Sequence, residues 1–302
     1  MAKTATPVGV LVRRKRLIIL AIAVIIIILV PVVYFYSSSA NQSVQPRAAI
    51  VDQLGSSKLD VVIRHENQSF IEAAKEFLYT RFSAIDYYSD NATIEQYKQL
   101  GSANYKLIVW RAHSALDQSS KYVAISSTEK YTEGRYQEYL DNEQLTLCNV
   151  TGEADIHKMY LGITPKFIRE IMNGRFEDTV IVLMSCNGLR SGYYETARAF
   201  EDKGVKVVIS WNEWVSSFDN DDGASLLLQH LINGNDTVSG AVSKTPTYPP
   251  ELGGARLMYD PSTAADYRIP DYRQSESAKA QALVMPSVSR KSTVPEDVSS
   301  QN

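Results

Sequence analysis

The sequence predicts an α/β domain with a mainly parallel central sheet that is flanked by helices. From residue 59 onward, short apolar runs of strand length alternate with amphipathic segments of helix length, which is the pattern of a parallel sheet covered by helices. The chain has 302 residues, of which 44% are hydrophobic, and this is enough to form one layered domain with a sizeable core.

The N-terminus predicts a transmembrane helix at residues 17–36, which contain no charge. About 20 helical residues, at roughly 1.5 Å each, span a hydrocarbon core of about 30 Å. The preceding "RRKR" marks residues 1–16 as a basic cytoplasmic segment, so the main domain is expected on the extracytoplasmic side of the cell membrane. The alternative is a cleaved signal peptide, but the apolar run is longer than usual for one, and the following "SSSANQS" is a weak cleavage site.

The rest of the chain divides by composition. Residues 37–57 are polar and predict a stalk, residues 58–273 predict the α/β domain, and residues 274–302 predict a disordered polar tail. Asn-x-Ser/Thr sequons agree with an external, glycosylated protein, and they occur at Asn41, Asn67, Asn91, Asn149 and Asn235.

The elements of the first half are predicted from periodicity. The expected strands are 59–64 ("LDVVIR"), 84–88 ("AIDYY") and 105–113 ("YKLIVWRAH"). Helices are expected at 69–82, with Ser69 as N-cap, and at 93–100, where a threonine begins the pattern.

In the second half, the polar segment 119–151 predicts a hairpin excursion from the main sheet. The strands "TVIVLM" and "VKVVISW" follow at 179–184 and 205–211. Helices are expected around them, at 164–174, 193–204 and 223–234; the first has proline at its first position and a glycine stop.

Two of these strands end in reactive residue types, His113 and Cys186. The carboxyl ends of neighbouring parallel strands meet at one edge of a sheet, where ligands bind. A free thiol is only a few per cent thiolate at neutral pH, and a nearby imidazole or helix N-terminus raises that fraction. Gly188 permits a tight turn after the cysteine, and the backbone N–H groups of that turn are suited to stabilise an oxyanion. Asn187 is expected either to form the turn or to take part in the site.

From the residues alone, three interpretations of Cys186 stay open. A thiol at the end of a strand is commonly a small packed side chain. In an external protein, Cys148 and Cys186 can form a disulfide. The third interpretation is a nucleophile paired with His113. The four histidines and two cysteines show no metal-ligand spacing, and a formal net charge of -3 gives no basis for binding nucleic acid.

The segments "YKLIVWRAHSA" and "DTVIVLMSCNGL" resemble the caspase-like cysteine peptidases of clan CD, most closely the CHAT, separase and gingipain types. The resemblance covers residues 59–242. It implies the three-layer sandwich of the caspase-haemoglobinase fold, with His113 after the third core strand and Cys186 after the fourth as a catalytic dyad. The family usually has glycine after the histidine, whereas this chain has Ser114, whose Cβ restricts the turn that supplies an oxyanion N–H.

The resemblance also implies a substrate pocket in the loop after the fifth strand, "WNEWVSSFDNDD", and by spacing it points to Trp211, Asn212 and Asp221. An acid in a partly desolvated pocket favours Arg or Lys before the scissile bond, at P1. The alternative is that these acids cap the helix that follows and are solvated.

The sequence therefore predicts a membrane-anchored, extracytoplasmic cysteine endopeptidase that acts on peptides or proteins, with a preference for Arg or Lys at P1. Its chemistry needs no metal or organic cofactor. One alternative is a catalytically inactive caspase-like domain that serves in surface binding or signalling, which Ser114 favours. Another is a structural ectodomain with a bridge between Cys148 and Cys186.

Overall fold

The structure, a computed structural model, describes residues 45–248 and 254–274. The predicted cytoplasmic segment 1–16, the transmembrane helix 17–36 and all but the first residue of the predicted tail lie outside them. Among the described residues, no helix is long and apolar enough to span a bilayer.

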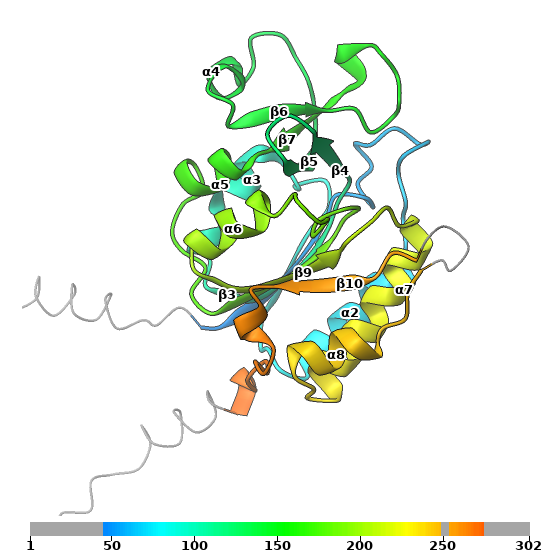
Figure 1. Ribbon diagram of the computed structural model, residues 1–302, viewed down its shortest axis with the longest axis vertical. Helices are drawn as coiled ribbons and strands as arrows, with labels where there is room; N and C mark the ends of the chain where they lie inside the picture. The colour runs from blue at the N-terminus through cyan, green and yellow to red at the C-terminus, as the bar shows by residue number, and fades with distance from the viewer. Residues whose placement is uncertain (1–44, 249–253, 275–302) are drawn as a thin grey trace, which may run out of the picture. The chain divides into compact units, whose positions relative to one another are not determined.

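A six-stranded sheet forms the centre of the described region, in the order β10-β9-β8-β3-β1-β2 (Figure 1). All neighbouring pairs are parallel except β10 with β9, which are antiparallel. The predicted α/β class with a mostly parallel sheet is therefore confirmed. The strands are β1 (Arg47–Asp52), β2 (Ile85–Tyr88), β3 (Tyr105–Arg111), β8 (Thr179–Met184), β9 (Val205–Trp211) and β10 (Leu257–Asp260).

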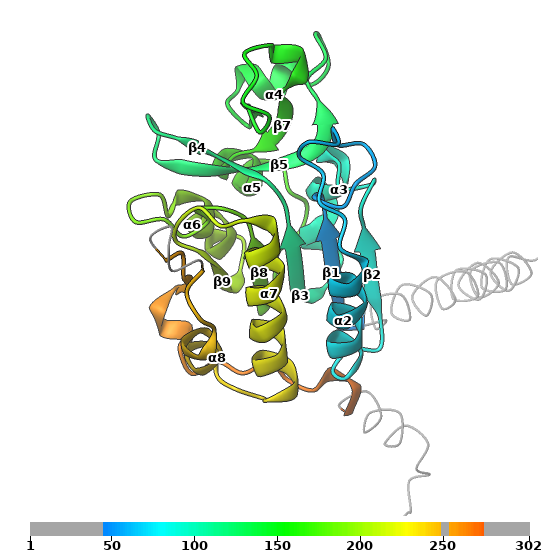
Figure 2. The same ribbon diagram turned by 90° about the vertical axis from the view of Figure 1, so that its right-hand side faces the viewer.

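Helices cover both faces of this sheet (Figures 1 and 2). Successive strand residues point to opposite faces, so Val182 joins one core and its neighbour Ile181 joins the other. The Val182 core lies under α2 (Gln68–Tyr79), α7 (Ser217–Leu228) and α8 (Val238–Lys244). The Ile181 core lies under α3 (Ile94–Gln99), α5 (Pro165–Glu170) and α6 (Glu195–Asp202). Because both faces are covered, every residue of β8 is buried, which explains its unbroken apolar sequence.

A second sheet accounts for the polar excursion. It is antiparallel and has the order β4-β5-β7-β6. Its strands are β4 (Ser114–Asp117), β5 (Tyr122–Lys130), β6 (Leu145–Cys148) and β7 (Tyr160–Ile163), with the short helix α4 (Gln137–Asp141) before β6. The hairpin expected at 119–151 is thus part of a larger sheet, which begins directly after His113.

The predicted stalk and the first predicted strand are wrong. Residues 47–52 lie within the expected stalk, yet they form β1 between β3 and β2. Two alanines shorten its apolar run, but Ala48 to Val51 are all fully buried. The predicted strand 59–64 is instead a loop, in which Val61 and Val62 are 78% and 83% exposed. β-branched side chains favour strands only where neighbouring strands can cover them.

The helix termini differ from the predictions in two places. Asn67, and not Ser69, caps α2 by accepting from the N–H of Phe70. Helix α7 begins at Ser217, six residues before the predicted Gly223, because Ser216 caps it. The acidic "FDNDD" is therefore its first turns. The threonine start expected for α3 is confirmed, because Thr93 caps it, and the proline expected at the first position of α5 follows its cap, Thr164.

The contact between Gly162 and Cys148 in the second sheet gives a test of this packing. An added Cβ at Gly162 would overlap the Cys148 sulfur. Gly162→Ala should therefore lower the free energy of unfolding by about 1–3 kcal/mol, measured by urea denaturation. In a Cys148→Ala background, the same substitution should cost clearly less. Equal costs in the two backgrounds would contradict the contact.

Candidate active site at the carboxyl edge of the sheet

His113 and Cys186 leave neighbouring strands at the same edge. In the parallel register of β3 and β8, Arg111 pairs with Met184, and the next N–H, that of Ala112, donates to the Met184 carbonyl at 3.3 Å. Each reactive residue lies two positions beyond its member of that last pair. The backbones that carry the imidazole and the thiol are therefore adjacent.

The His113 imidazole is oriented by a backbone carbonyl. Its Nε2 lies 2.8 Å from the carbonyl oxygen of Ile63, which belongs to the loop between β1 and α2. A carbonyl can only accept, so Nε2 carries the proton and Nδ1 carries the lone pair. The ring is mostly buried, and this burial lowers its pKa. At neutral pH the imidazole is therefore neutral, with Nδ1 as its basic atom.

The Cys186 side chain is a free thiol that is half buried. Its Sγ donates to the carbonyl of Val215, at 3.3 Å, in the loop between β9 and α7. Burial raises its pKa. Cys148 is also free, and it lies fully buried in β6. The structure thus contradicts the alternative of a disulfide between the two.

The dyad is adjacent but not joined by a hydrogen bond. Within the described residues, the imidazole and the thiol each contact a different loop, through Ile63 and Val215. Both groups are neutral at neutral pH in this arrangement. The structure therefore shows no resting thiolate–imidazolium pair.

Ser114 connects the two halves of the site. Its hydroxyl donates to the carbonyl of Cys186 at 2.6 Å, which the glycine usual in caspase-like peptidases has no side chain to do. As the first residue of β4, it also adopts extended backbone. The serine thus fixes the nucleophile turn to the strand that follows the histidine.

Asn187 and Gly188 form the turn after Cys186. Asn187 has a φ of 61°, in the left-handed region, and its N–H donates to the Glu213 carbonyl at 3.0 Å, so this N–H is not available to an oxyanion. Position 188 requires glycine because the turn lies close to β9, where an added Cβ would overlap the Ser210 hydroxyl. Both residues therefore shape the turn and pack it against β9.

The residues expected to line a substrate pocket have other partners. Trp211 is fully buried, and its Nε1 donates to Asn220 at 2.7 Å. Asn212 accepts from the N–H of Arg256 at 2.9 Å. Asp221 is 2% exposed and forms an ion pair with Arg111. Trp211 and Asp221 are therefore too buried to contact a substrate side chain, and the charge of Asp221 is already compensated.

The main feature that the sequence analysis missed is the environment of Arg111. Its guanidinium is fully buried and contacts Asp221 through Nε and Nη2, at 2.6 and 2.8 Å, and Asp52 through Nη1, at 2.7 Å. The available signal was a charged residue at the end of each of two apolar runs, "RAAIVD" and "KLIVWR". An unpaired charge is rarely buried, so two such charges at one sheet edge indicate a pair.

Exposed apolar side chains flank the site on both loops. Val61 and Val62 precede Ile63 in the loop that orients the histidine. Trp214, 56% exposed, precedes Val215 in the other loop, and Phe218, 71% exposed, lies in the first turn of α7. The Phe218 ring packs edge-on against His65 of the first loop, with ring centroids 4.4 Å apart. An extended peptide that reaches Cys186 would pass beside apolar surface.

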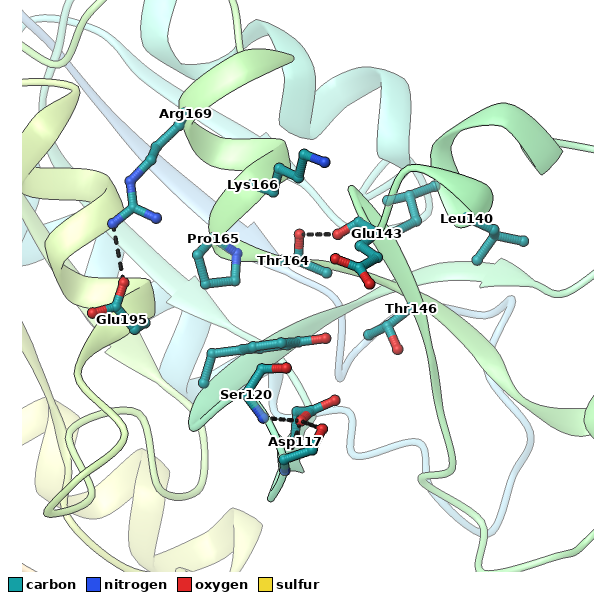
Figure 3. A pocket seen from close by; sticks show the side chains of 13 residues that line it. Asp117, Ser120, Leu140, Glu143, Thr146, Thr164, Pro165, Lys166, Arg169 and Glu195 are labelled. Carbon is teal, nitrogen blue, oxygen red and sulfur yellow. Dashed lines mark hydrogen bonds and ion pairs between the residues drawn. The ribbon is translucent and has the colours of Figure 1, made fainter.

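A separate cavity of about 410 Å³ lies between the second sheet and helices α5 and α6 (Figure 3). Its lining includes no residue of the dyad or of the two flanking loops. Several polar groups around it bind one another, as in the ion pair of Arg169 with Glu195. This cavity is therefore not the site of the chemistry described above.

No protein-family model matches the chain, and no curated protein matches it.

The two cysteines should differ in reactivity toward iodoacetamide. Because burial raises the pKa of Cys186, its alkylation rate should rise with pH, with a midpoint above the value of about 8.5 for an exposed cysteine. Cys148 is fully buried with a pKa of about 12, so it should react only after denaturation. Mass spectrometry of native and unfolded protein, with Cys186→Ser as control, measures both. A midpoint well below that of exposed cysteine would instead indicate a preformed thiolate.

Proposed function

We propose that the protein is a caspase-like cysteine endopeptidase in which Cys186 is the nucleophile and His113 the general base. The observation that carries this is the hydrogen bond from His113 Nε2–H to the Ile63 carbonyl. It leaves Nδ1 as the proton acceptor at the edge that also presents a free, half-buried thiol.

The reaction follows from these groups. The thiol proton moves to His113 Nδ1 as Sγ attacks the peptide carbonyl carbon, giving a tetrahedral oxyanion. The imidazolium then protonates the leaving amine, the C–N bond breaks, and a thioester to Cys186 remains. Water, deprotonated by Nδ1, attacks the thioester, and the acid product leaves as the thiol is reprotonated. No external oxidant or cofactor enters this balance.

The strand order supports the caspase-like assignment. Along the chain, β3 is the third strand of the central sheet and β8 is the fourth, and the histidine and cysteine follow them in that order. The proposal does not include Asp221 as a receptor for Arg or Lys at P1, because Arg111 already neutralises it. The exposed apolar side chains of the two loops favour substrates with apolar residues near the scissile bond.

One observation favours the alternative of an inactive binding domain. The thiol and the imidazole are each hydrogen-bonded to a different loop, and Ser114 ties the Cys186 carbonyl to β4. If neither loop moves when a peptide arrives, the proton transfer does not occur. The domain would then present its exposed apolar loops to a partner without cleaving it.

We also propose that residues 17–36 anchor the protein in the cell membrane with the catalytic domain outside. The support is the uncharged apolar run with basic residues before it. Protease added to intact cells should remove the domain and spare the N-terminal segment. Protection of the domain from that protease would contradict this orientation.

The catalytic proposal predicts different losses for different variants. Cys186→Ala should abolish hydrolysis of a fluorogenic peptide library that varies P1 over basic and bulky apolar residues, since no other group forms the thioester. His113→Ala should lower kcat/KM by about 10²–10⁴-fold, the usual contribution of a general base.

Cys148→Ala is the matched control, because it removes a thiol that lies outside the site, and it should leave hydrolysis unchanged. Equal hydrolysis by the wild type and Cys186→Ala would reject the peptidase. A folded wild type whose Cys186 is alkylated normally, but which cleaves no peptide in the library, would favour the binding domain.

A further inference from the structure

The buried charges around Arg111 lie directly beside the segment that orients His113. Arg111 precedes the histidine by two residues on β3, and it binds a carboxylate from β1, Asp52, and one from α7, Asp221. The two contacts to Asp221 are bidentate, the geometry in which a guanidinium holds a carboxylate most firmly.

These charges also hold the end of the loop between β1 and α2. Arg111 Nη1 donates to the carbonyl of His65 at 2.9 Å, and Asn67 Nδ2 donates to Asp221 at 2.8 Å. The ring of His65 lies against the same carboxylate, with Nε2 3.3 Å from Asp221 Oδ2. The last residues of the loop are thus bound to the Arg111–Asp221 pair.

The rest of the loop has separate supports. The hydroxyls of Ser56 and Ser57 both donate to Asp90, and the Asp60 N–H donates to the Tyr160 hydroxyl. Between these supports and the Arg111–Asp221 pair lies Ile63, whose carbonyl orients His113. The exposure of Val61 and Val62 leaves little side-chain packing in this stretch. The position of Ile63 therefore depends on these anchors together with two backbone hydrogen bonds, from the Ile63 N–H to Asp60 and from the His65 N–H to Leu54.

The backbone of His113 is held independently. Its N–H donates to Gln53 Oε1 at 3.0 Å, and Gln53 in turn donates to the Ser127 carbonyl. A change in the Arg111–Asp221 pair would therefore move the acceptor of the imidazole proton and leave the histidine backbone in place.

We propose that Arg111 and Asp221 are positioning residues for the dyad: they fix the Ile63 carbonyl, and through it the Nε2–H tautomer and ring orientation of His113. This inference rests on the proposed function for its catalytic meaning, but the hydrogen bond itself can be measured without any activity. Asp221 is thus assigned to orient the base and not to bind a basic substrate side chain.

The test is NMR of the full-length protein labelled with ¹⁵N-histidine. In the wild type, the His113 Nε2–H proton should be visible because its hydrogen bond protects it from exchange with water; His113→Gln identifies the signal. Asp221→Asn keeps the side-chain size and leaves Arg111 paired with Asp52, but places an amide donor toward the donors of Arg111 or Asn67. It should speed exchange of that proton at least about tenfold.

Asp90→Asn is the matched control, because it makes the same change at the loop support farther from Ile63 in the sequence, where the amide oxygen can still accept from a serine hydroxyl; it should accelerate exchange clearly less than Asp221→Asn. If Asp221→Asn does not fold, Asn67→Ser serves instead: serine still caps α2 but loses the amide donor to Asp221, and a smaller acceleration is expected.

An unchanged exchange rate in the folded variant, or equal acceleration by Asp90→Asn, would overturn the positioning role. A wild type that shows the protected signal but cleaves no peptide would refute the proposed function and leave the positioning role standing. Where the wild type is active, Asp221→Asn should lower kcat more than it changes KM.

Discussion

The burial of one positive charge constrains the carboxyl edge of this sheet. Arg111 has no exposed surface, so its guanidinium needs partners inside the protein, and Asp52 and Asp221 provide them. Removing one partner of a buried pair typically costs about 3–5 kcal/mol, a large part of the 5–15 kcal/mol that holds a domain folded. The pair therefore ties β1, β3 and α7 together. The elements that it joins also carry the histidine and both flanking loops.

The chemistry of the dyad depends on how neutral groups are arranged at this edge. Burial lowers the pKa of His113 and raises that of Cys186, so both shifts oppose a resting ion pair. If Cys186 acts as proposed, a bound substrate that excludes water has to supply the stabilisation that the thiolate lacks at rest. The carbonyl of Ile63 helps here, because an accepted Nε2–H bond stabilises the imidazolium that forms.

Much of the fold could be predicted, because its signals are local. The strands β8 and β9 were predicted to the residue, since both faces of the sheet are covered and most residues of both strands are apolar and buried. The sequence analysis did not predict β1, because its alanines carry little hydrophobic signal. It assigned 59–64 to a strand because the residues "LDVVIR" alone do not show whether neighbouring strands cover them. The pairing of Asp52, Arg111 and Asp221 joins residues far apart in the chain. Apolar periodicity does not report such contacts, so Asp221 was interpreted as a free pocket acid.

The peptidase and the binding domain differ in one physical respect, which is the mobility of two loops. The Ile63 loop is attached to the buried pair, while the Val215 loop holds the thiol through a single 3.3 Å contact to a weak donor. Of the two restraints, the one on Cys186 is therefore the easier to break. A peptide that displaces the Val215 carbonyl would release the sulfur without disturbing the histidine. The firmly held imidazole and the weakly held thiol therefore fit the proposed peptidase, whose site would be completed when a substrate binds, better than they fit an inert surface.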